Sequence, residues 1–192
     1  MLRACKKPYV AFSCGKDSTV LADMILRISP GTPLRFVSSG ETRLIHNVDD
    51  VIDYFRSTYY AEIEEINYDR FFSGGWQGKN YDEVRASAHG DIKSLNRNTS
   101  FDGVFMGLRK EESRKRKISL SLCQSEELPW NMYKYADREF YRMCPLANWK
   151  TEDVGAYIVE HDIPVLNWYN SFGFDARTTR GVAPSRMSAP EA

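Results

Sequence analysis

The stretch Tyr9-Val10-Ala11-Phe12-Ser13-Cys14-Gly15-Lys16-Asp17-Ser18 decides the fold, because an apolar run leads through a short polar turn into a helical pattern. Apolar residues then recur at helical spacing, at Val20, Leu21, Met24, Ile25 and Ile28, until Pro30-Gly31 ends the pattern. A turn between a strand and a helix leaves unpaired N–H groups at the positive end of the helix dipole, where phosphate binds. We therefore predict a nucleotide phosphate site at residues 13–18.

The side chains of this turn suit an anion. Lys16 supplies a positive charge, Gly15 lets the backbone approach the ligand closely, and Ser13 and Ser18 offer hydroxyl groups. Asp17 has two possible roles, since it can orient a metal ion or, like Ser18, cap the helix. The turn is not the common Gly-x-x-x-x-Gly-Lys-Ser/Thr loop, because only Gly15 precedes the lysine.

Strand and helix patterns alternate after the turn. We predict strands at 34–37, 61–66 and 104–106, a helix carrying Leu44, Val48, Val51, Ile52 and Phe55, and a last helix that Thr151 caps and Pro164 ends. Residues 71–79 read as a loop, and 84–95 form a weaker helical pattern. The alternation predicts an α/β fold with a Rossmann-like open, mostly parallel sheet, helices on both faces, and ligands at the carboxyl ends of the strands.

Length and composition indicate one globular domain. We assign residues 1–181 of the 192 to it and predict a mobile tail at 182–192, whose residues are small, polar or proline. The formal net charge of +0 provides no overall attraction to nucleic acid or a membrane surface. No apolar segment approaches the ~20 residues that span a bilayer, and no signal peptide is recognisable. We expect a cytoplasmic protein that binds neither membranes nor nucleic acid.

The cysteines do not form a metal-binding pattern. Cys5, Cys14, Cys123 and Cys144 include no C-x-x-C pair and have no histidine at ligand spacing. We therefore expect reduced thiols and neither zinc nor an iron–sulfur cluster. Cys14 is the thiol that we expect to be reactive, because it precedes a helix N-terminus and lies beside a lysine.

A second candidate anion site follows the strand at 104–106. Residues 107–117 contain six basic residues, which alone are typical of a solvated helix start paired with Glu111 and Glu112. Their position at the sheet edge that also carries residues 13–18 favours an anion site instead. Arg109 and Arg114 are the best candidates, because a guanidinium group binds phosphate or sulfate in a bidentate manner.

Three segments carry a family resemblance. Residues 13–18 resemble the Ser-Gly-Gly-x-Asp-Ser loop of the adenine nucleotide α-hydrolase (PP-loop ATP pyrophosphatase) superfamily, with Cys14 in place of its first glycine. Residues 107–114 resemble the Gly-x-Arg-x-x-Glu-Ser-x-x-Arg segment of the phosphoadenosine phosphosulfate (PAPS) reductase family, whose last arginine is Arg114 or Arg116 here. Residues 145–154 resemble that family's Pro-Leu-x-x-Trp-x-x-x-Asp-Val segment. The chain is thus similar to PAPS reductase-like proteins.

The resemblance implies an adenine nucleotide site. Phosphates would bind residues 13–18, adenosine would lie near Val37, Ser38, Ser39 and Gly40, and the anionic end would meet Gly107, Arg109 and Arg114. Lys16, Asp17 and Arg109 would be the catalytic residues. Arg177 and Arg180 would close over the phosphates, unless they belong to an ordinary basic tail.

The resemblance leaves several activities open. The reductases carry their nucleophile in a Glu-Cys-Gly-x-His segment, and no cysteine follows Cys144, so we do not expect an ordinary reductase. The leading hypothesis is an enzyme that cleaves ATP between the α- and β-phosphates, with Mg²⁺ bound through the nucleotide, and transfers AMP to an unknown acceptor. One alternative is reduction of PAPS or adenylylsulfate (APS) with Cys14 as the thiol, or an ATP-sulfurylase-like activity. Another is a non-catalytic subunit that binds a nucleotide and depends on a partner protein. The sequence leaves open whether the chain forms a homodimer or binds a different protein.

Overall fold

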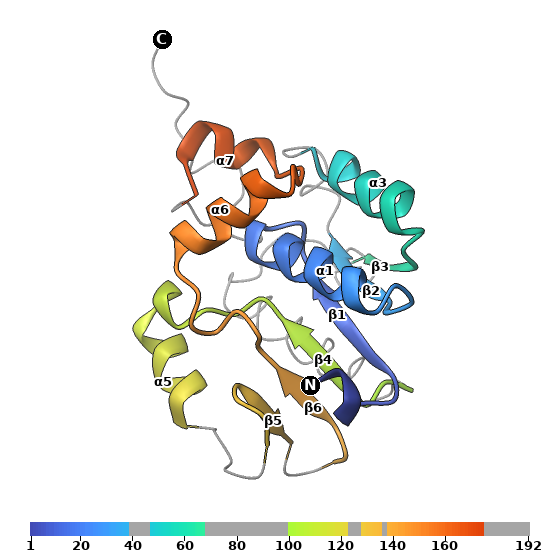
Figure 1. Cartoon of the computed structure of the whole chain (residues 1–192), viewed down its shortest axis with the longest axis vertical. Coiled ribbons are helices and arrows are strands. Elements are labelled where there is room, and N and C mark those ends of the chain that lie inside the picture. Colours follow the sequence, from blue (N-terminus) through green and yellow to red (C-terminus); the bar gives the residue numbers. More distant parts are fainter. Residues whose placement is uncertain (39–46, 68–99, 123–127, 136–137, 175–192) are drawn as a thin grey trace, which may run out of the picture.

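The computed structural model describes residues 1–38, 47–67, 100–122, 128–135 and 138–174 (Figure 1). Its strands are β1 (Pro8–Phe12), β2 (Leu34–Ser38), β3 (Ile63–Asn67), β4 (Gly103–Met106), β5 (Met132–Lys134) and β6 (Tyr141–Met143). Its α-helices are α1 (Lys16–Ile28), α3 (Val48–Tyr59), α5 (Arg114–Leu122), α6 (Thr151–Glu160) and α7 (Asn167–Phe172). Two short 3-10 helices, η1 (Leu2–Ala4) and η3 (Lys110–Glu112), complete the described elements.

The six strands form one sheet in the order β3-β2-β1-β4-β6-β5. Every neighbouring pair is parallel except β5 and β6, which are antiparallel. The predicted mostly parallel, Rossmann-like sheet is therefore confirmed. The chain passes from β1 to β2 on one side and later places β4 on the other side of β1, so the strand order reverses at β1. Open α/β sheets bind ligands at such a switch point, beyond the carboxyl ends of the strands.

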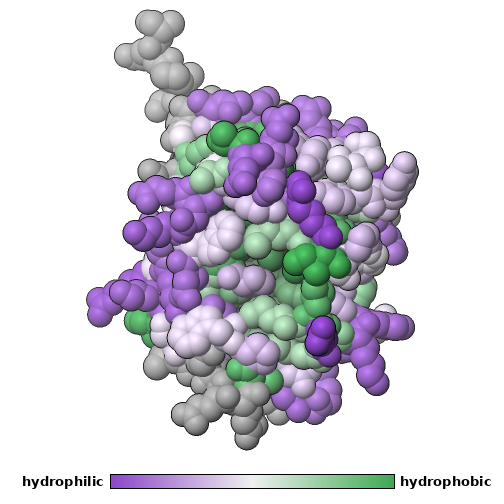
Figure 2. All heavy atoms as spheres, viewed as in Figure 1, coloured by the Kyte–Doolittle hydropathy of each residue, from purple (hydrophilic) through white to green (hydrophobic). Residues whose placement is uncertain are grey.

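The two faces of the sheet carry separate apolar clusters. Val10 and Phe12 of β1 belong to the main core, to which α1, α3 and α6 contribute, and these helices lie together over one face (Figure 1). Tyr9, which alternates with them, packs with Val104 and Phe140 on the other face. In the space-filling view apolar side chains gather across the middle of the molecule and hydrophilic ones border them (Figure 2). The alternation along β1 thus gives the central strand apolar packing on both sides.

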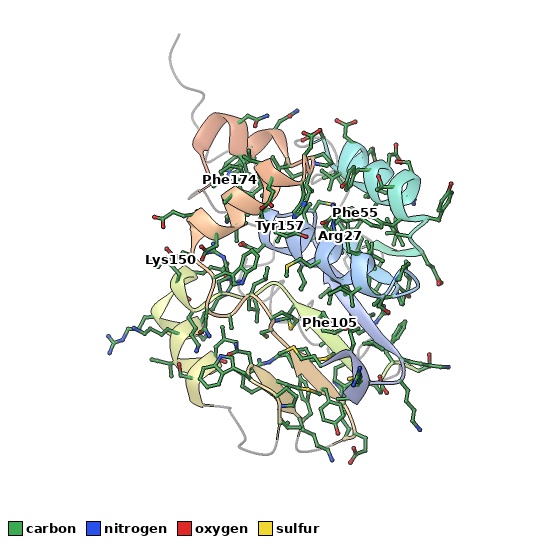
Figure 3. All side chains as sticks on the ribbon, in the orientation of Figure 1. Arg27, Phe55, Phe105, Lys150, Tyr157 and Phe174 are labelled. Atoms are coloured by element: carbon green, nitrogen blue, oxygen red, sulfur yellow. The ribbon has the colours of Figure 1, made fainter. Side chains whose placement is uncertain are left out.

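A buried carboxylate joins three helices over the main core. Asp23 of α1 is 0% exposed and accepts a hydrogen bond of 2.7 Å from Arg27. Hydroxyl groups of Tyr54 and Tyr59 on α3 and of Tyr157 on α6 also donate to it, and Arg27 and Tyr157 are labelled in Figure 3. Burial by itself would raise the pKa of Asp23, but the donated hydrogen bonds lower it below its ordinary value of 3.8. The carboxylate therefore fixes α3 and α6 against α1.

Several elements differ from the sequence expectations. β5, β6 and α7 were not predicted, and residue 150, not Thr151, is the N-cap of α6. The N–H group of Lys150 donates to Asp153 Oδ2 (2.7 Å), while that of Thr151 donates to Glu111 Oε2 (2.8 Å). A carboxylate from a distant segment thus takes part in starting this helix, which local sequence could not reveal. Leu44, the loop at 71–79, the helix at 84–95 and the tail at 182–192 lie outside the described residues.

Among the described helices, none combines the length and the apolar character needed to cross a membrane.

Candidate functional site

The turn between β1 and α1 is closed by the side chain of Ser18. Its Oγ accepts the N–H of Ser13 (3.1 Å) and donates to the carbonyl oxygen of Gly15 (2.9 Å). Gly15 is the N-cap of α1, and no side chain bonds there as a cap, so the expected capping by Asp17 or Ser18 is wrong. Ser18 shapes the turn instead. The first amides of α1 therefore have no capping side chain from their own segment.

Cys14 stands where the family's loop has its first glycine, and its backbone conformation is one that favours glycine. Its φ of 56° lies in the left-handed region, which residues with a Cβ adopt at a cost. The side chain is completely buried and belongs to the main apolar core. The thiol therefore packs inward, away from solvent, which does not favour the alternative in which Cys14 attacks a sulfonucleotide.

Gly107 allows the segment 107–114 to lie against the turn at residues 13–18. It follows β4, which pairs with β1, and lies beside the first turn of α1. A Cβ atom at Gly107 would lie 2.8 Å from the carbonyl carbon and oxygen of Asp17 and 3.0 Å from the nitrogen of Ser18. Only glycine fits without a shift of one backbone. The structure thus brings residues 13–18 and 107–109 together at the switch point.

Arg109 is enclosed by groups of the protein. Its Nε lies 2.6 Å from Asp17 Oδ1 and its Nη1 lies 2.9 Å from Glu111 Oε2. The guanidinium also donates to the carbonyl oxygen of Trp149 and to Thr151 Oγ1, and the residue is only 2% exposed. In this arrangement Arg109 links the starts of α1 and α6. Arg114, by contrast, begins α5 with an exposed side chain.

Lys16 is held between Asp17 and an aromatic residue of α7. Its ammonium nitrogen lies 3.3 Å from Asp17 Oδ2 and 5.4 Å from the centre of the Tyr169 ring. Its backbone N–H donates to the Tyr169 hydroxyl oxygen at 3.1 Å, and Lys16 is 5% exposed. Tyr169 is the site residue that the sequence analysis missed. The two residues are 153 positions apart, and no local spacing connects them.

The other predicted site residues are only partly described. Val37 and Ser38 end β2 next to β1, at the same edge of the sheet as the turn. Ser39, Gly40, Arg177 and Arg180 lie outside the described residues. The position of β2 is therefore compatible with an adenosine site at this edge, and the contacts of these residues stay predictions.

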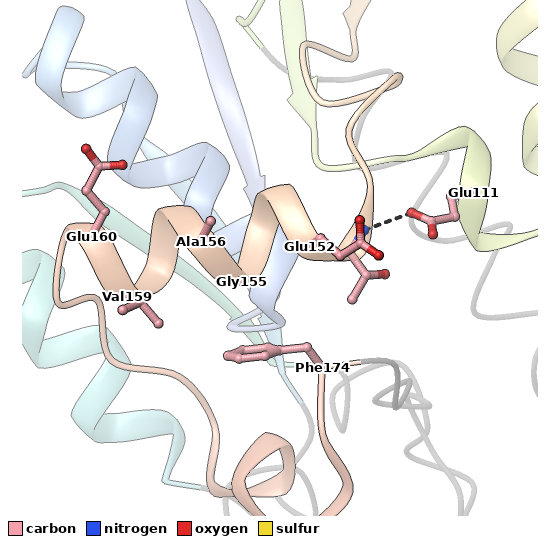
Figure 4. Close-up of a pocket in the computed structure, with 8 residues that line it drawn as sticks. Glu111, Glu152, Gly155, Ala156, Val159, Glu160 and Phe174 are labelled. Atoms are coloured by element: carbon pink, nitrogen blue, oxygen red, sulfur yellow. Dashed lines mark hydrogen bonds between the residues drawn. The ribbon is translucent and has the colours of Figure 1, made fainter.

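A cavity of about 660 Å³ lies beside α6, next to this site (Figure 4). Its lining comprises Glu111, Thr151, Glu152, Gly155, Ala156, Val159, Glu160 and Phe174. Glu111, at one end, is the residue that bonds Arg109, and the dashed line in Figure 4 marks its bond from the Thr151 N–H. Phe174 stacks on Tyr169 with ring centres 5.9 Å apart. Two residues that line the cavity, Glu111 and Phe174, thus contact residues of the candidate site.

The described residues contain no cluster of three or more histidine, cysteine or acidic side chains suited to a metal ion. Cys5, Cys14 and Cys144 are buried, and Cys123 lies outside the described part. Burial raises the pKa of the Cys144 thiol to about 11, and burial together with the charge of Asp102 does the same for Cys5. These two thiols are therefore poor nucleophiles near neutral pH.

Comparison with known proteins identifies the family. Residues 7–175 match the phosphoadenosine phosphosulfate reductase domain. The chain belongs to this family. The match covers all three segments on which the resemblance was based, so the predicted membership of the PAPS reductase-like family is confirmed.

Curated relatives in the family carry two kinds of name. Sulfate adenylyltransferase subunit 2 of Streptomyces lavendulae is 26% identical over 209 residues, covering 96% of this chain and 64% of that protein. Phosphoadenosine 5'-phosphosulfate reductase of Buchnera aphidicola is 24% identical, covering 91% of this chain and 71% of that protein. The chain thus spans less than two thirds of the length of the adenylyltransferase relative.

Solved structures share the fold. The PAPS reductase from Candida auris, a phosphate complex, has a TM-score of 0.54 at 18% identity and covers 86% of this chain and 78% of its own. The U34-tRNA thiolase NcsA of Methanococcus maripaludis, which carries a [4Fe-4S] cluster, has a TM-score of 0.54 at 15% identity, with 82% and 58% coverage. At these identities the likeness concerns the fold alone.

Proposed function

We propose that this chain binds ATP with its phosphates on residues 13–18 and transfers AMP to a small oxyanion such as sulfate, releasing pyrophosphate. The observation that carries the proposal is the position of the first turn of α1, which lies at the switch point of the sheet with Lys16 and Gly107 beside it. Relatives named sulfate adenylyltransferase subunit 2 support this form of the reaction.

The proposed mechanism depends on charge neutralisation and positioning. Attack on the α-phosphate moves negative charge onto pyrophosphate, which the amides of residues 15–18 and the Lys16 ammonium stabilise. Mg²⁺ enters as part of the nucleotide substrate. Asp17 already binds Arg109 and Lys16, which fits a role in orienting Lys16 better than a role as a metal ligand. Adenosine lies at the end of β2, near Val37, Ser38, Ser39 and Gly40.

The arginines have different proposed roles. Arg109 is a positioning residue, because its buried guanidinium already bonds Asp17, Glu111 and neighbouring oxygens. Arg114 is exposed and binds the anionic end of the bound ligand or the acceptor. Arg177 and Arg180 close over the phosphates.

We further propose that the chain works with a second protein in the cytoplasm. Several relatives are named as subunit 2 of an enzyme, which supports dependence on a partner.

Reduction of a sulfonucleotide is the second candidate function. The name of the Buchnera relative favours it. The reaction requires a thiolate that reaches the sulfur atom, and all the cysteines in the described part of the chain are buried. Adenylyl transfer needs no protein nucleophile, so the described geometry supports it better.

The test is to incubate the protein with Mg²⁺, ATP and sulfate, with and without a co-purified partner, and to measure pyrophosphate and adenylylsulfate. Lys16→Ala should abolish formation of both products. The matched control Lys6→Ala changes an exposed lysine before β1 and should leave the rate unchanged. Formation of ADP and phosphate, or full activity of Lys16→Ala, would contradict the proposal. Release of sulfite from PAPS would favour the second candidate.

A further inference from the structure

The amide that the proposed function assigns to a phosphate already has a partner within the protein. Lys16 is the first residue of α1, and its N–H donates to the Tyr169 hydroxyl oxygen at 3.1 Å. The Tyr169 ring also lies under the Lys16 ammonium, with the nitrogen 5.4 Å from the ring centre. Both residues are buried. One side chain from α7 thus occupies the N–H of Lys16 and covers its ammonium group.

A phosphate oxygen and the tyrosine oxygen compete for this N–H group, because its single hydrogen points to one acceptor. Buried Tyr169 cannot simply rotate into solvent, since its ring also stacks on Phe174 at an interplanar angle of 22°. Withdrawal of the hydroxyl therefore requires a movement of the segment that carries both rings. A phosphate gains more from the site than a neutral hydroxyl, because it also pairs with Lys16.

α7 is attached at its two ends in different ways. At its start, the N–H of Asn167 donates to Asn47 Oδ1 (2.6 Å), and Asn47 Nδ2 donates to the Val165 carbonyl oxygen (3.3 Å). These bonds do not involve the phosphate site. Beyond its end, Gly173 has a φ of 76° and an open environment, so the backbone there accepts conformations that other residues resist. Asn47 thus anchors the start of the short helix, and a pivot about this anchor would draw Tyr169 away from Lys16.

We propose that Tyr169 is a built-in competitor of the nucleotide: its hydroxyl oxygen accepts the Lys16 N–H, and a bound phosphate displaces it together with α7. The inference rests on the proposed function, because it concerns the same site. Tyr169 would then set the affinity of the site for phosphate. Its displacement would also couple phosphate binding to the cavity beside α6. Phe174, which stacks on Tyr169, forms one wall of that cavity.

The first test is a calorimetric titration with inorganic pyrophosphate. Tyr169→Phe removes the competing oxygen and keeps the ring, so pyrophosphate should bind about two- to tenfold more tightly than to the wild type. Tyr60→Phe, at an exposed tyrosine after α3, is the matched control and should bind like the wild type. Equal or weaker binding by Tyr169→Phe, with normal binding by the wild type, would overturn the competitor role and leave the phosphate site intact. If neither protein binds pyrophosphate, the proposed function fails as well.

The second test uses only the wild-type protein, so it does not depend on how a variant folds. Amide hydrogen exchange is measured with and without pyrophosphate. We expect slower exchange in residues 13–18 and faster exchange in residues 167–172, because α7 loses its bond to Lys16. Slower exchange in both segments would mean that α7 closes on the ligand, which contradicts the proposal. Unchanged exchange at 167–172 with slower exchange at 13–18 would contradict it too.

Discussion

The guanidinium of Arg109 and the carboxylate of Asp17 form an ion pair in which Nε and Oδ1 are 2.6 Å apart. The two residues come from the two motifs that the sequence analysis singled out, 92 positions apart. The pair joins the turn after β4 to the first turn of α1, and Glu111 extends it to the start of α6. The geometry of the proposed phosphate site thus depends on an arginine that is itself buried.

Replacing Arg109 should therefore destabilise the whole protein. Arg109→Ala breaks the largely buried ion pair with Asp17, which keeps only Lys16, and empties the space of a side chain that is 2% exposed. We expect a loss of about 3 kcal/mol in the free energy of unfolding. Urea denaturation measures this loss. The control is Arg56→Ala, since Arg56 pairs with Glu65 at the surface and should contribute less than about 1 kcal/mol. An equally small effect of Arg109→Ala would show that the buried pair is not structural.

Gly107→Ala should disturb the turn at residues 13–18 directly. The new Cβ would lie 2.8 Å from the Asp17 carbonyl group, so the turn or the start of α1 must shift. We expect a loss of about 1–3 kcal/mol in stability and weaker nucleotide binding. Gly31→Ala is a suitable comparison because nothing lies within 4 Å of its Cβ position. Denaturation and calorimetry on both variants check this, and normal stability and binding of Gly107→Ala would contradict the close approach.

Cys14 offers a test of backbone strain. Cys14→Ala and Cys14→Gly both lose the buried thiol, but only glycine removes the cost of the left-handed φ of 56°. We expect the glycine variant to be more stable than the alanine variant by about 1 kcal/mol, even though glycine is the more flexible residue in the unfolded chain. Thermal or urea unfolding of the pair gives this difference. Greater stability of the alanine variant would show that the left-handed backbone is not strained.

Asp23 should make stability depend on pH. Its folded-state pKa is lower than the ordinary value of 3.8, so its ionised form stabilises the protein above that value. This contribution is lost as the pH falls through the lower folded-state pKa. Asp23→Asn should therefore be less stable than the wild type at neutral pH, and the difference should shrink below pH 3.8. Asp50→Asn, at an exposed position of α3, is the surface control and should change the free energy of unfolding at neutral pH by less than about 1 kcal/mol. If the stability difference between Asp23→Asn and the wild type did not change with pH, the Asp23 charge would not stabilise the protein.

The central part of the fold was predictable because local sequence patterns decide it. β1 is a short continuous apolar run, α1 has a clear helical pattern, and the polar residues between them indicate a turn. β5 and β6 are only three residues long, too short for a pattern, and they are defined by pairing with each other and with β4. Their polar and aromatic residues gave no local signal of a strand.

The sequence predicted which segments meet at the candidate site, but not the contacts between their side chains. Gly107 and Lys16 could be assigned to one edge because parallel strands end at the same edge of a sheet. That Arg109 is buried between carboxylates, and that Tyr169 reaches the Lys16 amide, depends on packing between segments far apart in the sequence. Neither residue type nor spacing could distinguish an arginine that binds a ligand from one that joins two helices.

The most direct test of the central claim is a titration of isotopically labelled protein with pyrophosphate, followed by the amide resonances of individual residues. The account predicts large shifts for the amides of Gly15, Lys16, Asp17 and Ser18, which Lys16→Ala reduces. The amides at the start of α3, Val48 to Asp50, form a second helix N-terminus within the same protein and should not shift. If pyrophosphate moved resonances elsewhere and left residues 15–18 unchanged, the phosphate site would not lie at the start of α1.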